Sequence, residues 1–138
     1  MSRRKIEILD STLRDGAQGE GISFSVSDKL NIVKALDSFG IDFIEAGNPG
    51  SNPKDMEFFQ QAVNLELMHA KLCAFGSTCR SGIHPKDDKN INALIDSGVD
   101  TLVIFGKTWD LHVKKVLNIS LNLGSGILPA ILSWVCFL

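Results

Sequence analysis

Short apolar runs alternate with longer segments of helical spacing along most of the chain, and glycine-rich or polar loops separate them. Runs of β-type pattern predict strands at residues 5–9, 43–46, 71–75 and 101–105. Apolar positions spaced by three and four predict helices at residues 28–39, 54–64, 90–97 and 109–117. Ser27 is the expected N-cap of the first helix, and Gly40 and Gly98 are expected stops. The repeated strand–helix order, about 30 residues per unit, predicts an α/β fold with parallel strands.

Two architectures satisfy this order: an open, doubly wound sheet, and a (β/α)₈ barrel cut at its midpoint. Periodicity alone does not separate them. In both architectures ligands bind at the carboxyl ends of the strands. Any active site is therefore expected where the first loop follows the first strand and where Glu45 ends the second.

The loop after the first strand, DSTLRDGAQ at residues 10–18, carries the chemistry. Asp15 offers carboxylate oxygens to a hard divalent cation, and the Arg14 guanidinium beside it can hold a carbonyl or enolate oxygen. Gly16 is expected to permit a tight turn. The alternative is turn chemistry with a local Asp–Arg ion pair, and a carboxylate such as Glu45 is more often solvated than catalytic. The loop lacks a GxGxxG register or a P-loop lysine, which argues against a phosphate cradle.

Composition limits the remaining classes. The net charge of −2 offers no argument for nucleic-acid or membrane-surface binding. Cys73, Cys79 and Cys136 are odd in number and form no CxxC pair, which argues against a disulfide framework or thiolate zinc site. No apolar run precedes Asp10, so no secretory signal is expected. A cytoplasmic location is the default expectation.

Several motifs in a fixed order resemble those of the pyruvate carboxyltransferase-like barrel superfamily. DSTLRDGAQ resembles the signature shared by 2-isopropylmalate synthase, homocitrate synthase, citramalate synthase and hydroxymethylglutaryl-CoA lyase. Four further segments look most like the citramalate synthase branch: GAQGEGISFSVSDKL (16–30), IEAGNPGSNPKD (44–55), AFGST (74–78) and IFGKTWDLH (104–112). The resemblance spans about residues 5–120 and implies the N-terminal half of a TIM (β/α)₈ barrel, with about four βα units.

The resemblance also implies roles. Asp15 would be a ligand of a divalent metal (Mg²⁺, Mn²⁺ or Zn²⁺), Arg14 would stabilise the enolate or hold the keto carbonyl, Glu45 would belong to the catalytic wall, and Gln18 would join Arg14 in substrate binding. The implied reaction is a Claisen condensation of acetyl-CoA with pyruvate or another 2-keto acid, in branched-chain amino-acid (isoleucine or leucine) biosynthesis. The intact enzyme would be a homodimer.

Part of the family pattern is missing. The resemblance implies two metal-binding histidines in an HxH arrangement, whereas His69, His84 and His112 do not pair at that spacing, and the chain has no tyrosine. A lone carboxylate should bind Mg²⁺ or Mn²⁺ weakly, because affinity grows with the number of ligands. This chain is therefore expected to be inactive and without metal on its own.

Residues 121–138 form an uncharged, apolar tail that departs from the family pattern, so the expected division is a partial barrel at 1–120 and a tail at 121–138. Its unbroken apolar part is too short for a membrane span, and glycine and proline interrupt it. The favoured hypothesis is an out-of-frame or alternative-exon reading of a truncated gene.

Three functions stay open. The first is a Claisen acyltransferase, with 2-isopropylmalate synthase and hydroxymethylglutaryl-CoA lyase as alternatives within that class. The second is a non-catalytic half-barrel that pairs with an intact subunit. The third, a membrane-tethered product, rests on the tail alone.

Overall fold

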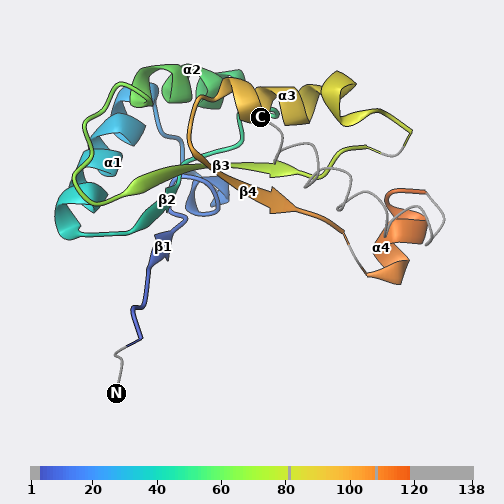
Figure 1. The fold of residues 1–138 in the computed structure, drawn as a ribbon, viewed down its shortest axis with the longest axis horizontal. Helices are drawn as coiled ribbons and strands as arrows, with labels where there is room; N and C mark the ends of the chain where they lie inside the picture. The colour runs from blue at the N-terminus through green and yellow to red at the C-terminus, as the bar shows by residue number, and fades with distance from the viewer. Residues whose placement is uncertain (1–3, 81, 108, 119–138) are drawn as a thin grey trace.

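Four parallel strands form one sheet in the computed structural model, which describes residues 4–80, 82–107 and 109–118 (Figure 1). The strands are β1 (Leu9–Asp10), β2 (Phe43–Glu45), β3 (Lys71–Ser77) and β4 (Thr101–Phe105). They lie in the order β1–β2–β3–β4, and every neighbouring pair is parallel. The four predicted strands are therefore present.

The three helices that connect the strands begin at side-chain caps. They are α1 (Val26–Phe39), α2 (Pro53–Ala62) and α3 (Lys89–Asp96), and α4 (Asp110–Lys115) follows β4 without such a cap. Short 3₁₀ turns lie at Gly16–Gln18 and Pro85–Asp87. Asn52 caps α2 and Asp88 caps α3 through side-chain oxygens that accept backbone N–H groups. The C-cap of α1 is Gly40, in the left-handed region at φ 90°.

The sequential strand order decides between the two predicted architectures. A doubly wound sheet reverses its strand order near the middle, so that the first strand lies between later ones. Here each strand pairs with the next along the chain, as in a (β/α)₈ barrel. The described residues therefore supply four consecutive βα units of barrel type.

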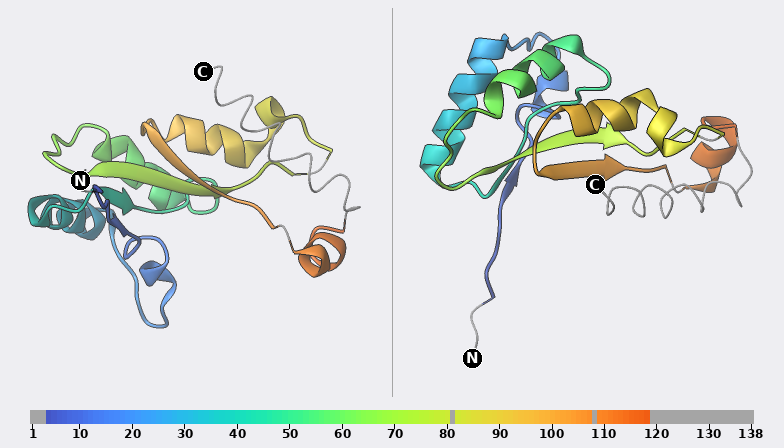
Figure 2. Two further views of the ribbon diagram at one scale, coloured as in Figure 1. Left: turned by 60° about the horizontal axis from the view of Figure 1, so that its bottom comes forward. Right: turned by 45° about the horizontal axis from the view of Figure 1, so that its top comes forward.

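One face of the sheet carries the hydrophobic core. Figure 2 shows α2 and α3 along the same side of β3. The fully or nearly buried apolar side chains come from the helices and from alternate strand positions: Val33, Ile44, Phe58, Phe59, Ala62, Leu72, Ala74, Ile91 and Leu94. Gly76 belongs to this face, since a Cβ there would lie 2.6 Å from Cδ1 of Leu94. Close packing of α3 on β3 therefore requires glycine at position 76.

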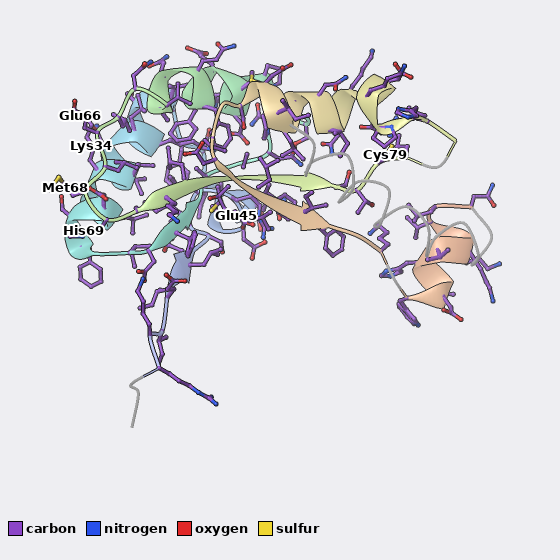
Figure 3. The ribbon with its side chains drawn as sticks, in the orientation of Figure 1. Lys34, Glu45, Glu66, Met68, His69 and Cys79 are labelled. Carbon is purple, nitrogen blue, oxygen red and sulfur yellow. The ribbon has the colours of Figure 1, made fainter. Side chains whose placement is uncertain are left out.

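The other face of the sheet holds the intervening strand residues, among them Phe43, Glu45, Cys73 and Phe75. Side chains on this face would point to the interior of a closed barrel. Leu9 and Phe105, on the outermost strands, are each 49% exposed. In Figure 3, Glu45 lies near the middle of the sheet, on the side away from α2 and α3.

Two predicted boundaries are wrong. Residues 5–8 are not strand, because the neighbouring strand β2 has only three residues and leaves them without a partner for a strand ladder. The N–H of Ile8 donates instead to the Asp42 side chain, at 2.9 Å. The N-cap of α1 is Ser25, not Ser27. Ser25 accepts from the N–H of Asp28 at 3.1 Å, and the Asp28 carboxylate accepts from the N–H of Ser25 at 2.9 Å, which forms a capping box.

None of the helices within the described residues has the length and apolarity needed to cross a membrane. The predicted tail at 121–138 lies outside the described residues.

Candidate active site

The loop after β1 turns back on itself through local hydrogen bonds. The Asp10 carboxylate accepts from the N–H and from Oγ1 of Thr12, both at 3.0 Å. The carbonyl of Ser11 accepts from the N–H groups of Arg14 (3.1 Å), Asp15 (2.8 Å) and Gly16. This turn chemistry, the alternative weighed from the sequence, is present and places Arg14 beside the end of β2.

Arg14 is held on three sides. Its Nε donates to Oε2 of Glu45 at 2.7 Å, and its Nη1 donates to Oδ1 of Asp15 at 2.9 Å. The guanidinium carbon lies 4.2 Å from the ring centre of Phe75, within the range of a cation–π contact. Residues from the first loop, β2 and β3 therefore fix one guanidinium.

The two carboxylates that contact Arg14 differ in exposure. Glu45 is 2% exposed, whereas the Asp15 side chain is 64% exposed. The expectation that a strand-end glutamate is solvated is wrong for Glu45, which is buried and paired. Burial, together with the nearby Glu45 carboxylate, raises the pKa of the Cys73 thiol to about 11.

A cavity of about 310 Å³ opens beside Arg14. Arg14 and Gln18 both line it, while Asp15 and Glu45 do not. The other lining residues come from the first loop, from α1, from the loop after β2, from the start of α2 and from β3: Leu13, Ala17, Ile22, Ser23, Phe24, Lys29, Asn48, Ser51, Asn52, Lys54, Asp55 and Phe75. The lining combines the Arg14 and Gln18 side chains with apolar residues such as Leu13 and Phe75, a mixture suited to a small anionic or carbonyl-bearing molecule.

The described residues do not form a complete metal site. No group of three or more His, Cys, Asp or Glu side chains gathers anywhere within the described ranges. Asp15, the predicted ligand, already shares Oδ1 with Arg14. His69 and His84 are exposed, and Nδ1 of His84 accepts from the N–H of Lys86. Asp15 without further ligands does not fit a tightly held divalent cation.

The glycine that the site requires is Gly47, and the expectation for Gly16 is wrong. Gly16 has no positive φ, and a Cβ there would make only ordinary contacts, the nearest at 3.7 Å. Gly47 has φ +147°, and a Cβ there would lie 2.5 Å from Oδ2 of Asp55. Sequence reasoning also missed Phe75, Lys29 and Asp55. A signal for the last two existed, because both are charged residues at inward-facing helix positions.

The sequence of this chain is similar to those of several known proteins. The profile of the HMGL-like family matches residues 5–128. (R)-citramalate synthase of Sulfolobus acidocaldarius is 49% identical over 122 residues, which cover 88% of this chain and 23% of that protein. The Geobacter sulfurreducens (R)-citramalate synthase is 51% identical over 117 residues, covering 85% and 22%. A 2-isopropylmalate synthase of Listeria innocua is 35% identical over 117 residues, covering 85% and 22%.

A solved structure supports the fold. HMG-CoA lyase of Bacillus subtilis superposes with a TM-score of 0.68 at 18% sequence identity, covering 95% of this chain and 42% of that one. The predicted N-terminal part of a TIM barrel is thereby confirmed. The chain spans about a fifth of the length of the curated relatives it matches. On the family match, the fold and the motif order, the chain belongs to the HMGL-like family.

Proposed function

We propose that this chain supplies the first half of the active site of an acyl-CoA:2-keto acid acyltransferase that joins acetyl-CoA to pyruvate. The observation that carries the proposal is the Arg14 guanidinium, which lines the cavity and is held by Glu45, Asp15 and Phe75. Identity of about 50% to (R)-citramalate synthases supports this choice of reaction.

Arg14 would bind the oxygen that gains negative charge. A guanidinium has five N–H donors, and two of them are engaged by Glu45 and Asp15, so three can serve a substrate. In the proposed reaction a base removes a proton from the acetyl methyl group, and the resulting carbon nucleophile adds to the keto carbonyl carbon. Water then cleaves the thioester, which releases the carboxylate product and the CoA thiol. Arg14 would stabilise the enolate oxygen or the keto oxygen.

Gln18 and Glu45 would act beside Arg14. Gln18 lines the cavity and would donate to the substrate through its amide. Glu45 would orient the guanidinium, because its buried carboxylate accepts a hydrogen bond from Nε. Asp15 is the candidate ligand for a divalent metal, whose remaining ligands the described residues do not supply.

The described portion holds four strands of barrel type, and we propose that turnover needs the remaining half of the barrel. A non-catalytic half-barrel that pairs with an intact subunit is the competing proposal. Larger 2-keto acids compete with pyruvate as substrate, since a 2-isopropylmalate synthase is also a relative.

A chimera tests the function. The segment of the Geobacter sulfurreducens (R)-citramalate synthase that aligns with this chain is replaced by the aligned residues of this chain, and thiol release from acetyl-CoA is followed with and without pyruvate. We expect pyruvate-dependent release, and a loss of about 10²–10³ in kcat for Arg14→Lys, as for removal of one oxyanion donor. Lys34→Ala, on the exposed side of α1, is the matched control. Full activity of the Arg14→Lys chimera would refute the role of Arg14, and no release in the unmutated chimera would count against the function.

A further inference from the structure

A buried ion pair joins the inward faces of α1 and α2. Lys29 is 4% exposed and Asp55 is 7% exposed. Nζ of Lys29 donates to Oδ1 of Asp55 at 2.5 Å and lies 5.5 Å from the ring centre of Phe58. Charges removed from water are tolerated only where their remaining donors and acceptors find partners. The partners of this pair show what it does.

Both partners come from the backbone that follows β2. Nζ of Lys29 donates to the carbonyl of Ala46 at 2.8 Å, and Oδ2 of Asp55 accepts from the N–H of Asn48 at 2.8 Å. The pair therefore binds the backbone on both sides of Gly47 through hydrogen bonds. A Cβ at Gly47 would lie 2.5 Å from Oδ2 of Asp55 and 2.9 Å from Nζ of Lys29, so the glycine and the two charges fit only as a unit.

The other side of this segment is fixed by β3. The N–H of Ala46 donates to the carbonyl of Cys73 at 3.0 Å, and the N–H of Phe75 donates to the carbonyl of Gly47 at 2.9 Å. These bonds extend the β2–β3 ladder past the end of β2, up to the residue that stacks on Arg14. Residues 46–48 are thus clamped between β3 and the buried pair.

The clamped segment borders the candidate active site on both sides. Ala46 follows Glu45, which holds Nε of Arg14, and Asn48 lines the same cavity as Arg14. We infer that the Lys29–Asp55 pair is a positioning device: by clamping residues 46–48 it sets Glu45 against Arg14 and holds Asn48 at the cavity. This deepens the proposed function, on which its catalytic meaning rests, but the positioning can be measured without turnover.

A merely structural pair would stabilise the fold without affecting the site, and a double substitution separates the two roles. Replacing a buried ion pair by apolar residues of similar volume is often neutral for stability, whereas removing one partner leaves a buried charge alone. Lys29→Met with Asp55→Leu should therefore melt within about 5 °C of the unmodified chain. It cannot hold the Ala46 carbonyl or the Asn48 N–H. Lys34→Met, at an exposed position on α1, is the matched control.

The measurement is solvent exchange in the ¹⁵N-labelled full chain. The Nε–H signal of Arg14, identified by its loss in Arg14→Lys, and the backbone N–H of Asn48 report the two ends of the device. We expect the double variant to raise exchange by about tenfold or more at both groups, with Lys34→Met unchanged. A double variant that keeps its melting temperature and the original exchange at Nε–H of Arg14 would overturn the inference, because the Asn48 N–H loses its acceptor directly.

A second variant acts from the loop side. Gly47→Ala removes no charge but drives a Cβ into the pair. It should raise exchange at Nε–H of Arg14 by about tenfold as well. If the double variant fails to fold, unchanged exchange at Arg14 in Gly47→Ala overturns the inference on its own. These exchange measurements need no substrate. If the chimera is inactive but the variants still raise exchange at Arg14, the proposed function is refuted and the positioning role of the Lys29–Asp55 pair is supported.

Discussion

Asp37 at the inner face of α1 offers a test of how buried polar groups hold this fold together. Its carboxylate accepts three backbone N–H groups in the segment before β3: Met68 (2.9 Å), His69 (2.8 Å) and Ala70 (2.7 Å). Met68 and His69 lie at the end of the sheet beside α1 in Figure 3. One side chain therefore ties the carboxyl-terminal half of α1 to the start of β3, at the end of the sheet opposite the candidate site.

The magnitude follows from which donors are buried. Met68 and His69 are exposed, so water can replace the lost acceptor at their N–H groups, whereas the Ala70 N–H is buried. An unsatisfied buried N–H costs about 1–3 kcal/mol and an exposed one much less. Asp37→Ala should therefore lower the free energy of unfolding by about 2–4 kcal/mol, seen as a fall in the midpoint of urea denaturation. Asp96→Ala, at an exposed position on α3, is the control and should change it by no more than about 0.5 kcal/mol.

The pH dependence gives the sharper check. The N–H of Ala70, and then those of Met68 and His69, lower the pKa of Asp37 against the opposing effect of burial. The native state thus favours the ionised carboxylate, and its stabilisation is fully present above the unfolded pKa of about 3.9. It is lost as pH falls through the lower pKa of the folded state. The gap in stability between the unmodified chain and Asp37→Asn should therefore narrow as pH falls below about 4, and a gap that stays constant to lower pH would refute this account.

Other predictions concern the caps, the thiol and the carboxylates. Asp88→Ala removes the N-cap of α3 and should cost about 1–2 kcal/mol in urea denaturation. Since the pKa of Cys73 is raised to about 11, iodoacetamide should leave it unmodified at pH 8 in the native chain and label it in urea, as read by peptide mass spectrometry. Glu45→Gln should cost about 2–3 kcal/mol because Arg14 loses its buried partner, while Asp15→Asn should stay within about 0.5 kcal/mol. Mg²⁺ should shift the NMR signals of Asp15 only above about 1 mM. Binding at lower concentration would mean that other residues also coordinate the ion.

The element order was predictable from the sequence, but the neighbours of each strand were not. Apolar periodicity is a local property, and it predicted four strands and four helices near their observed positions. The same periodicity fits a doubly wound sheet, so the order β1–β2–β3–β4 required the structure or the family resemblance. The length of β1 could not be predicted from the apolar pattern either, because its short partner β2 limits it to two residues.

Site residues that directly follow a strand were predictable from the sequence. Charged residues that face the core from a helix were missed. Arg14 and Glu45 were expected at one rim, and they form a hydrogen bond there. Lys29 occupies the same stripe of α1 as Val33 and Asp37, and Asp55 that of α2 with Phe58. Charged residues at such positions need partners. That rule marks Lys29 and Asp55 as residues that need partners, but it does not pair them, since Asp37 on the same stripe is held by backbone N–H groups instead.

The unequal burial of the two carboxylates around Arg14 has a chemical consequence. Glu45 is almost fully buried, so any movement of Arg14 away from it would leave a desolvated charge without a partner. Asp15 is mostly exposed, so water can take over its hydrogen bond at little cost in free energy. In the proposed function, an incoming substrate oxygen would displace Asp15 from Nη1 while Glu45 and Phe75 keep the guanidinium in place. Glu45 would then act as the fixed partner of Arg14 and Asp15 as the exchangeable one, so that under the proposed function Arg14 could accept a ligand without losing its orientation.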